Sequence, residues 1–207
     1  MDGARLTRHV PGGSMLEMDL LSYADACAAE PREMYDRAAW LYVPPYYDEY
    51  RYVLGTRGEK PLICIGLNPS TAMPGRLDNT LKSVERVAKF NGFDSFLMMN
   101  LYAQRATIPG QMDREASDFL HQENLRAFED LLGRTKTVWA AWGAVIETRG
   151  YLRGCMQDFV RVGQAHGATW VTAGRRSKQG HPHHPLYLRK DSVFDPFDAA
   201  EYVASLG

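Results

Sequence analysis

A segment rich in histidine and proline offers the side chains best suited to chemistry. It reads Gly-His-Pro-His-His-Pro-Leu-Tyr over residues 180–187 and holds three of the six histidines of the chain. Each proline fixes its own φ angle, lacks a backbone donor and keeps the preceding residue out of the helical region. The composition therefore predicts a stiff, extended loop that holds its imidazoles at set angles, a suitable place to bind a ligand.

Charge is distributed unevenly around this segment. Residues 159–190 contain six of the 24 Lys and Arg residues and none of the 25 Asp and Glu residues. This sorting favours an anionic ligand, such as phosphate or the backbone of a nucleic acid. An ordinary solvated basic surface is the alternative interpretation. The formal net charge of −1 argues against a protein that binds nucleic acid by electrostatics alone.

Two asparagines form the second group of candidate residues. Asn68 begins a polar run, Asn-Pro-Ser-Thr, directly after an apolar segment, and Asn100 ends another apolar segment. An Asn side chain can bind a carbonyl and an adjacent N–H group together, which suits the edge of a nucleobase. A neutral His can donate to a carbonyl that gains negative charge as a bond breaks. Together these groups describe a pocket for an extruded base, as base-flipping enzymes require.

Strands alternating with helices are expected to position these residues. Apolar runs predict strands at 50–54, 61–67, 95–99, 137–142 and 169–172, and periodic or capped segments predict helices at 78–90, 113–132 and 144–163 and one starting at 195–196. This alternation indicates an α/β fold, a three-layer α/β/α sandwich with a mostly parallel central sheet.

The chain is expected to divide into a short extension and one main domain. Residues 1–49 form a helical, Tyr- and Pro-rich extension, and residues 50–207 form the α/β domain. In the extension we expect a loose arm at 1–13, a helix opened by a capping box at 14–17, and a second short helix at 32–41. The segment 42–47 could be a lid or, more simply, a packed connection.

The ends of the predicted strands are expected to meet. In parallel sheets the carboxyl ends of the strands lie along one edge, and ligands bind in the crevice outside them. Asn68, Asn100, Gly143 and His181 each follow a predicted strand. We therefore expect these four positions to share one crevice although they are far apart in sequence.

Composition narrows the class of protein. The 207 residues are 45% hydrophobic, which is enough for a full core. Cys27, Cys64 and Cys155 are too few and too far apart for a disulfide framework or a CxxC metal motif, which suits a reducing, cytoplasmic compartment. No signal peptide and no apolar run long enough to span a membrane are recognisable. No cofactor is implied, and the oligomeric state is left open.

Four motifs resemble, in order, those of the uracil-DNA glycosylase superfamily. They are Gly66-Leu67-Asn68-Pro69, the run at 96–100 followed by Arg105-Ala106, then Trp142-Gly143-Ala144, and finally Gly180-His181-Pro182 with Pro185-Leu186. The resemblance implies a glycosylase-like fold and a DNA, nucleotide or nucleoside partner.

A closer resemblance is to the uncharacterised DUF1643 family, over about residues 50–193. It rests on Leu67-Asn68-Pro69-Ser70-Thr71-Ala72, on Asn100-Leu101 with Arg105-Ala106-Thr107, on Ala141-Trp142-Gly143, and on Lys178-x-Gly180-His181-Pro182-x-His184-Pro185-Leu186-Tyr187. This family resemblance implies a fold but no established reaction.

The glycosylase resemblance implies a role for each matched residue. Asn68 would position the attacking water, Asn100 would read the base edge, and His181 would stabilise negative charge on the leaving base. Leu186 would fill the gap left by a flipped base. The base pocket would also include Gly66, Ser70 and Trp142, and contacts to phosphate or nucleic acid would come from Arg105, Lys178, His184, Leu186 and Tyr187.

These residues support more than one function. The leading expectation is nucleobase binding of the glycosylase type, with hydrolysis of an N-glycosidic bond of a damaged or modified base as its enzymatic form. A non-catalytic nucleic-acid or nucleotide-binding module with the same pocket is the alternative. Metal-dependent hydrolysis is a third, because His181, His183 and His184 could bind a metal ion, although the prolines restrict their geometry.

Overall fold

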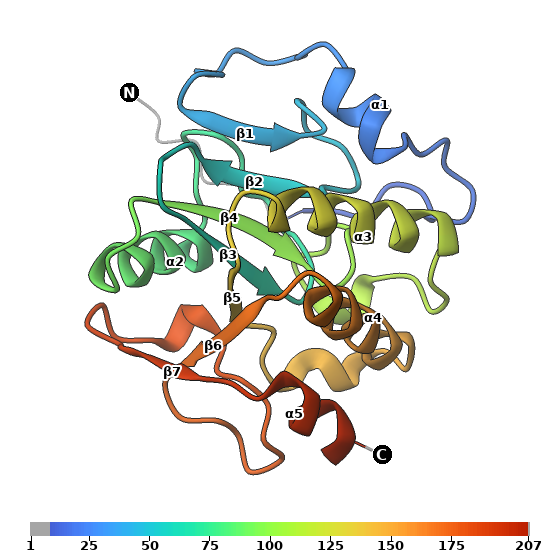
Figure 1. Cartoon of the computed structure of the whole chain (residues 1–207). Helices are drawn as coiled ribbons and strands as arrows, with labels where there is room; N and C mark the ends of the chain where they lie inside the picture. The colour runs from blue at the N-terminus through green and yellow to red at the C-terminus, as the bar shows by residue number, and fades with distance from the viewer. Residues whose placement is uncertain (1–8, 207) are drawn as a thin grey trace.

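A mixed sheet runs through the molecule, from β1 at the top of Figure 1 to β7 at the bottom. The structure is a computed structural model and describes residues 9–206. Within these residues the sheet has seven strands, in the order β1-β2-β4-β3-β5-β6-β7: β1 Trp40–Val43, β2 Val53–Thr56, β3 Pro61–Gly66, β4 Ser95–Asn100, β5 Thr137–Ala140, β6 Thr169–Ala173 and β7 Phe194–Pro196. The helices are α1 Tyr23–Ala28, α2 Asn79–Phe90, α3 Asp118–Leu132, α4 Tyr151–Ala165 and α5 Ala199–Ser205, with 3-10 helices η1 Pro109–Gln111, η2 Ala144–Thr148 and η3 Pro185–Tyr187.

The strand directions correct one expectation. The inner strands β4, β3, β5 and β6 run parallel to one another, whereas β1, β2 and β7 pair antiparallel at the two ends of the sheet. The α/β class is therefore confirmed, and the prediction of a mostly parallel sheet is wrong. A parallel neighbour needs a crossover of a dozen or more residues. The connection at 44–52 between β1 and β2 is too short for one, and the loop after β6 brings the chain back in the opposite direction.

Helices cover both faces of the sheet, because side chains of the inner strands alternate between two hydrophobic cores. In β3, Ile63 and Ile65 join the core that α3 and α4 complete, whereas Leu62 and Cys64 join the core that α2 completes. The apolar runs read from the sequence are therefore strands buried on both faces, as is usual for parallel strands between helical layers.

The path of the chain creates a crevice at the carboxyl end of β3. The connection from β3 to β4 passes through α2 on one face, and the connections through α3 and α4 pass over the other face. The neighbours of β3 in the sheet, β4 and β5, are thus reached by crossovers on opposite faces. Ligands in open α/β sheets bind at such a switch in strand order.

Of the two helices predicted in the first 49 residues, one starts later than expected and one is wrong. The capping box at 14–17 opens only a turn, and α1 begins later, where Ser22 accepts a hydrogen bond from the backbone N–H of Asp25. The helix expected at 32–41 is replaced by turns and by β1, because Trp40–Val43 pairs with β2. Pairing with a distant strand outweighed the local helical pattern in this segment.

Boundaries in the main domain differ for local reasons. Helix α2 lies where it was predicted, with Asp78 as its N-cap. Helix α3 starts only at Asp118, because Ser117 caps it. The expected helix at 144–163 is divided into η2 and α4, and the helix expected at 195–196 is the strand β7, followed by α5 after the Asp198 cap. The strand expected at 50–54 is shifted to Val53–Thr56.

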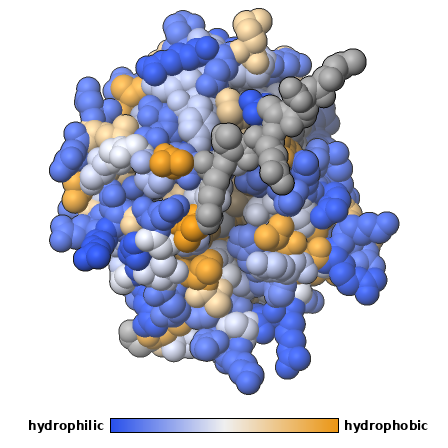
Figure 2. Space-filling model, turned by 180° about the vertical axis from the view of Figure 1, so that it is seen from behind, coloured by the Kyte–Doolittle hydropathy of each residue, from blue (hydrophilic) through white to orange (hydrophobic). Residues whose placement is uncertain are grey.

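The extension shares the sheet and the core with the rest of the chain. Strand β1 pairs with β2, and Met15 and Ala26 belong to the core that α3 and α4 complete. Among the described residues, no helix is both long and apolar enough to cross a membrane. On the face shown in Figure 2, hydrophilic residues predominate and hydrophobic ones appear in separate small groups.

Candidate functional site

A cavity of about 990 Å³ lies at the carboxyl ends of the parallel strands. Its walls come from the loops after β3, β4, β5 and β6 and from the first turn of α2. Asn68, Asn100, Gly143 and His181 all line it, so the expected convergence of these four positions is confirmed. The volume is at the upper end of the range of ligand sites, about 300–1,000 Å³.

Most of the residues selected from the sequence line this cavity, and three do not. The lining includes Gly66, Asn68, Ser70, Asn100, His181, His184, Leu186 and Tyr187. Trp142 is instead buried in the core, where its Nε1–H donates to the hydroxyl of Tyr202 at 3.1 Å. Arg105 is buried behind the cavity wall, and Lys178 is exposed outside the lining.

Asn68 presents an acceptor of fixed orientation. Its Nδ2 donates to the backbone carbonyls of Pro69 at 2.9 Å and Ala106 at 2.7 Å. An amide group has two donor hydrogens, and the backbone uses both, while Oδ1 accepts no hydrogen bond from the described residues. The proline after Asn68 stiffens this turn. Asn68 can therefore accept a hydrogen bond from a water molecule or from a ligand N–H group.

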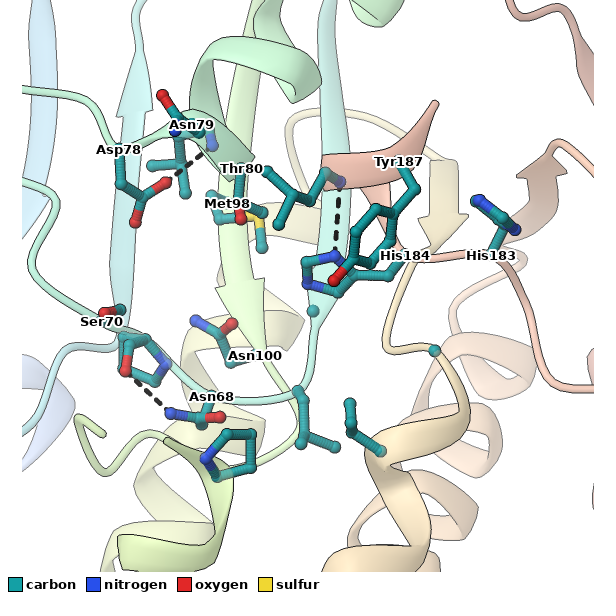
Figure 3. A pocket seen from close by; sticks show the side chains of 18 of the residues that line it. Asn68, Ser70, Asp78, Asn79, Thr80, Met98, Asn100, His183, His184 and Tyr187 are labelled. Atoms are coloured by element: carbon teal, nitrogen blue, oxygen red, sulfur yellow. Dashed lines mark hydrogen bonds between the residues drawn. The ribbon is translucent and has the colours of Figure 1, made fainter. Parts of the chain in front are cut away.

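Asn100 presents an unused donor. Its side chain is 1% exposed, and Nδ2 has no hydrogen-bond partner among the described residues. The residue lines the cavity at the end of β4, and Figure 3 shows it between Asn68 and His184. Gly66 makes room for it, because a Cβ at position 66 would lie 2.8 Å from the Asn100 Oδ1. A buried donor without a partner is costly, so a ligand or water molecule in the cavity that accepts this hydrogen bond would be stabilised.

His184 supplies a third polar group. Its Nδ1 accepts a hydrogen bond from the backbone N–H of Leu186 at 3.3 Å, which assigns the proton of the neutral ring to Nε2. Burial lowers the pKa of His184 and Asp78 opposes this shift, so the neutral form is favoured. Gly143 makes close contact possible, since a Cβ there would lie 3.2 Å from the His184 Cβ. His184 is thus a neutral donor beside the two asparagines.

His181 is held more firmly than His184. Its Nδ1 lies 2.7 Å from the Tyr202 hydroxyl, and its Nε2 lies 3.3 Å from Oε1 of Glu147. Because Trp142 donates to the same hydroxyl, Tyr202 is oriented to donate to His181. Burial lowers the pKa of His181, and the nearby Glu147 opposes this effect. Both ring nitrogens of His181 are thus engaged within the described chain, whereas the Nε2–H of His184 has no partner among the described residues.

The three loop histidines have different partners. His183 Nδ1 lies 3.1 Å from the backbone carbonyl oxygen of Arg175, while His181 and His184 bind the groups described above. Over residues 9–206, no three His, Cys, Asp or Glu side chains are grouped closely enough to hold a metal ion.

The charged lining is mostly cationic. The lining contains one carboxylate, that of Asp78, and four cations: Arg51, Lys82, Arg175 and Arg176. Asp78 Oδ1 accepts the backbone N–H of Leu81 and so caps α2. The N-terminus of α2 carries a partial positive charge that adds to these cations. The lining therefore suits a ligand with negative charge.

Arg51 was not identified from the sequence as a site residue. It lies within the predicted strand at 50–54, where an arginine between apolar residues was the available signal. From the sequence, Asp78 is expected to cap a helix and is also the carboxylate nearest to Asn68 that could assist catalysis, and its place in the cavity follows from the position of α2. Neither residue is close in sequence to the histidines with which it shares the cavity.

Acidification is expected to destabilise the protein through His181 and the half-buried His184. The pKa of His181 and of His184 is lowered from the ordinary value of 6.5, so the unfolded chain binds protons more readily. The free energy of unfolding should be highest above pH 6.5 and fall as the pH drops below it. Urea unfolding between pH 7 and pH 5 measures this fall, which should be smaller in His184→Gln. The exposed His166 gives the control variant His166→Gln, which should keep the whole effect, and an undiminished fall in His184→Gln would contradict the assignment.

Comparison with known proteins gives one match. Residues 51–186, more than half of the chain, match the family model described as "Protein of unknown function (DUF1643)". No curated protein and no solved structure matches the chain. The matched segment begins at Arg51 and contains the loops after β3, β4 and β5 and most of the loop after β6. The chain therefore belongs to the DUF1643 family.

Proposed function

We propose that this protein binds a nucleobase in its cavity, in the manner of the uracil-DNA glycosylase superfamily. The observation that carries the proposal is Asn100, whose buried Nδ2 has no partner among the described residues and lines the cavity. The Oδ1 of Asn68 adds an acceptor and the Nε2–H of His184 adds a donor. Fixed donors and acceptors around one space can read the edge of a base. The glycosylase-like form of the fold is part of this proposal.

The enzymatic form of the proposal is hydrolysis of an N-glycosidic bond. Asn68 would hold a water molecule through Oδ1, and this water would attack the anomeric carbon of the sugar. The bond between sugar and base would break with its electrons passing to the base. The donor Nε2–H of His184 would stabilise the developing charge, and the proton released by the water would end on the free base.

A second candidate is a binding module without catalysis. The observation that favours it is that the described lining offers no carboxylate free to act as a base beside Asn68, because its only carboxylate, Asp78, caps α2. An amide is not basic and can only position water. Such a protein would keep the pocket and the affinity but not the reaction.

One experiment tests both forms. The full chain is incubated with mononucleotides and with single- and double-stranded oligonucleotides that carry uracil, mismatched, deaminated or hydroxymethylated bases. Released base or alkali-labile sites that disappear in Asn68→Ala establish hydrolysis. Binding that survives in Asn68→Ala without turnover of any substrate by the wild type establishes the module. Absence of both binding and turnover would reject the proposed function.

A further inference from the structure

Two arginines are buried next to each other beneath the loop that carries Asn68. Arg51 and Arg105 are each 1% exposed, and both donate to the backbone carbonyl of Ala72, at 3.1 Å and 3.3 Å. Arg105 also donates to the carbonyl of Ser70 and, at 3.0 Å, to the hydroxyl of Tyr42. The loop at 68–72 is therefore underlain by two neighbouring positive charges.

Within residues 9–206, neither guanidinium is paired with a carboxylate. Among the described residues, no Asp or Glu oxygen lies within 4.0 Å of either side chain, and the Nε of each is buried without a hydrogen-bond partner. Arg105 is partly compensated, because its guanidinium lies over the ring of Tyr47 at 4.2 Å from the ring centre. The side chain of Arg51 makes only the hydrogen bond to Ala72 among the described residues. A buried charge without a partner is strongly unfavourable, so an anion next to Arg51 would be stabilised.

The cavity indicates where this anion would lie. Arg51 lines it, together with the hydroxyl-bearing Ser70 and Thr71 and the first turn of α2. Burial and the neighbouring Arg105 lower the pKa of Arg51 to about 9, so the side chain is still charged at neutral pH. Asp78 is the one carboxylate in this lining and already accepts the backbone N–H of Leu81. Guanidinium groups and a helix N-terminus are typical partners of phosphate.

We propose that Arg51 forms the floor of a subsite for a phosphate monoester, so that the ligand of this cavity is a nucleoside monophosphate. This inference rests on the proposed nucleobase site and adds the class of ligand. A group that reaches a guanidinium with 1% exposure must itself become buried. A terminal phosphate can be buried in this way. An internal phosphodiester cannot, because it is bonded to a nucleoside on each side and the strand must leave the cavity twice. The cavity of about 990 Å³ has room for base, sugar and phosphate together.

Thermal unfolding of the full chain tests the subsite. The probes are inorganic phosphate, nucleosides, the eight common nucleoside 5′-monophosphates, a dinucleoside monophosphate without a terminal phosphate, and a 5′-phosphorylated oligonucleotide, with sodium chloride at matched ionic strength as reference. At about 100 times Kd, a nucleoside 5′-monophosphate should raise Tm by about 5–10 °C. The dinucleoside monophosphate should raise Tm by no more than a nucleoside does. Tighter binding of the phosphorylated oligonucleotide would assign the same monoester chemistry to a strand end.

The variant Arg51→Met separates binding from structure. It should lose the shift produced by phosphate and, in phosphate-free buffer, unfold at the same temperature as the wild type or higher, because an unpaired buried charge is removed. Arg86→Met, which removes an exposed arginine of α2, should keep the full phosphate shift. Arg51→Lys keeps the positive charge but loses the planar guanidinium that can donate two parallel hydrogen bonds. This variant should therefore fold, and it should bind phosphate several-fold more weakly than the wild type.

The results distinguish the two proposals. Three results would each overturn the phosphate subsite. Phosphate could raise Tm equally in the wild type and Arg51→Met, it could leave the Tm of the wild type unchanged, or Arg51→Lys could bind phosphate as tightly as the wild type. Nucleosides test the base site alone, because they carry no phosphate. If phosphate raises the Tm of the wild type but nucleosides do not bind to it, the nucleobase site is rejected and the phosphate subsite is retained.

Discussion

Replacing Asn100 by alanine is expected to weaken nucleobase binding by about 5- to 150-fold. A bidentate contact between an amide and a base edge is worth about 1–3 kcal/mol, and each 1.4 kcal/mol corresponds to a tenfold change in affinity. The same substitution should change the free energy of unfolding by less than about 1 kcal/mol, because it removes a buried donor that has no partner in the described chain. Isothermal titration and urea unfolding measure the two effects.

Asn91→Ala is the matched control for this result. Asn91 ends α2 away from the cavity, where Nδ2 donates to the carbonyls of Val87 and Ser192 and Oδ1 accepts the backbone N–H of Phe194. Its loss should lower the free energy of unfolding by about 1–3 kcal/mol and leave affinity unchanged. If both variants lose affinity equally, or if Asn100→Ala is the less stable one, then Asn100 is a structural residue and not a reader of the ligand.

The second large effect is expected at Gly143, where the chain leaves β5 and enters η2. Its φ of 71° and ψ of −177° lie in a region open almost only to glycine. An added Cβ would also lie 3.2 Å from the Cβ of His184. Gly143→Ala should therefore cost about 1–3 kcal/mol of stability and displace His184, so that ligand affinity falls as well. Urea unfolding and titration with ligand check the two consequences.

Gly154→Ala is the control of opposite sign. Gly154 lies in α4, where an added Cβ would meet no atom of the described chain within 4 Å. Alanine at this position should stabilise the protein by about 0.5–1 kcal/mol, because it suits a helix better than glycine. A Gly143→Ala variant that unfolds at the same urea concentration as the wild type would show that the backbone at this strand end relaxes without strain.

Local sequence was sufficient for the elements in which several signals agree. The apolar runs of β3 and β4 and the Asp78 cap of α2 are found where the sequence predicted them, because strand pairing, burial and capping all favour the same boundaries. It was insufficient at residues 14–41. There a helical pattern is present, but the pairing of Trp40–Val43 with β2 contributes more than local propensity does.

The position of the cavity was also predictable. The sequence placed Asn68, Asn100, Gly143 and His181 after apolar strands, and parallel strands bring their carboxyl ends to one edge. The sequence could not show which side chains keep a free hydrogen-bonding group. His181 is held by Tyr202 and Glu147, whereas His184, three residues later, has one ring nitrogen left for a ligand.

The sequence by itself thus determined the α/β class, the segments that form the inner strands and the loops that form the site. Only the tertiary structure decided the mixed direction of the sheet, the burial of Arg51 beside Arg105 and the unpartnered amide of Asn100. The reason is physical. Apolar periodicity and caps are local properties of the chain, whereas burial of a charge and satisfaction of a donor depend on residues brought together from distant strands.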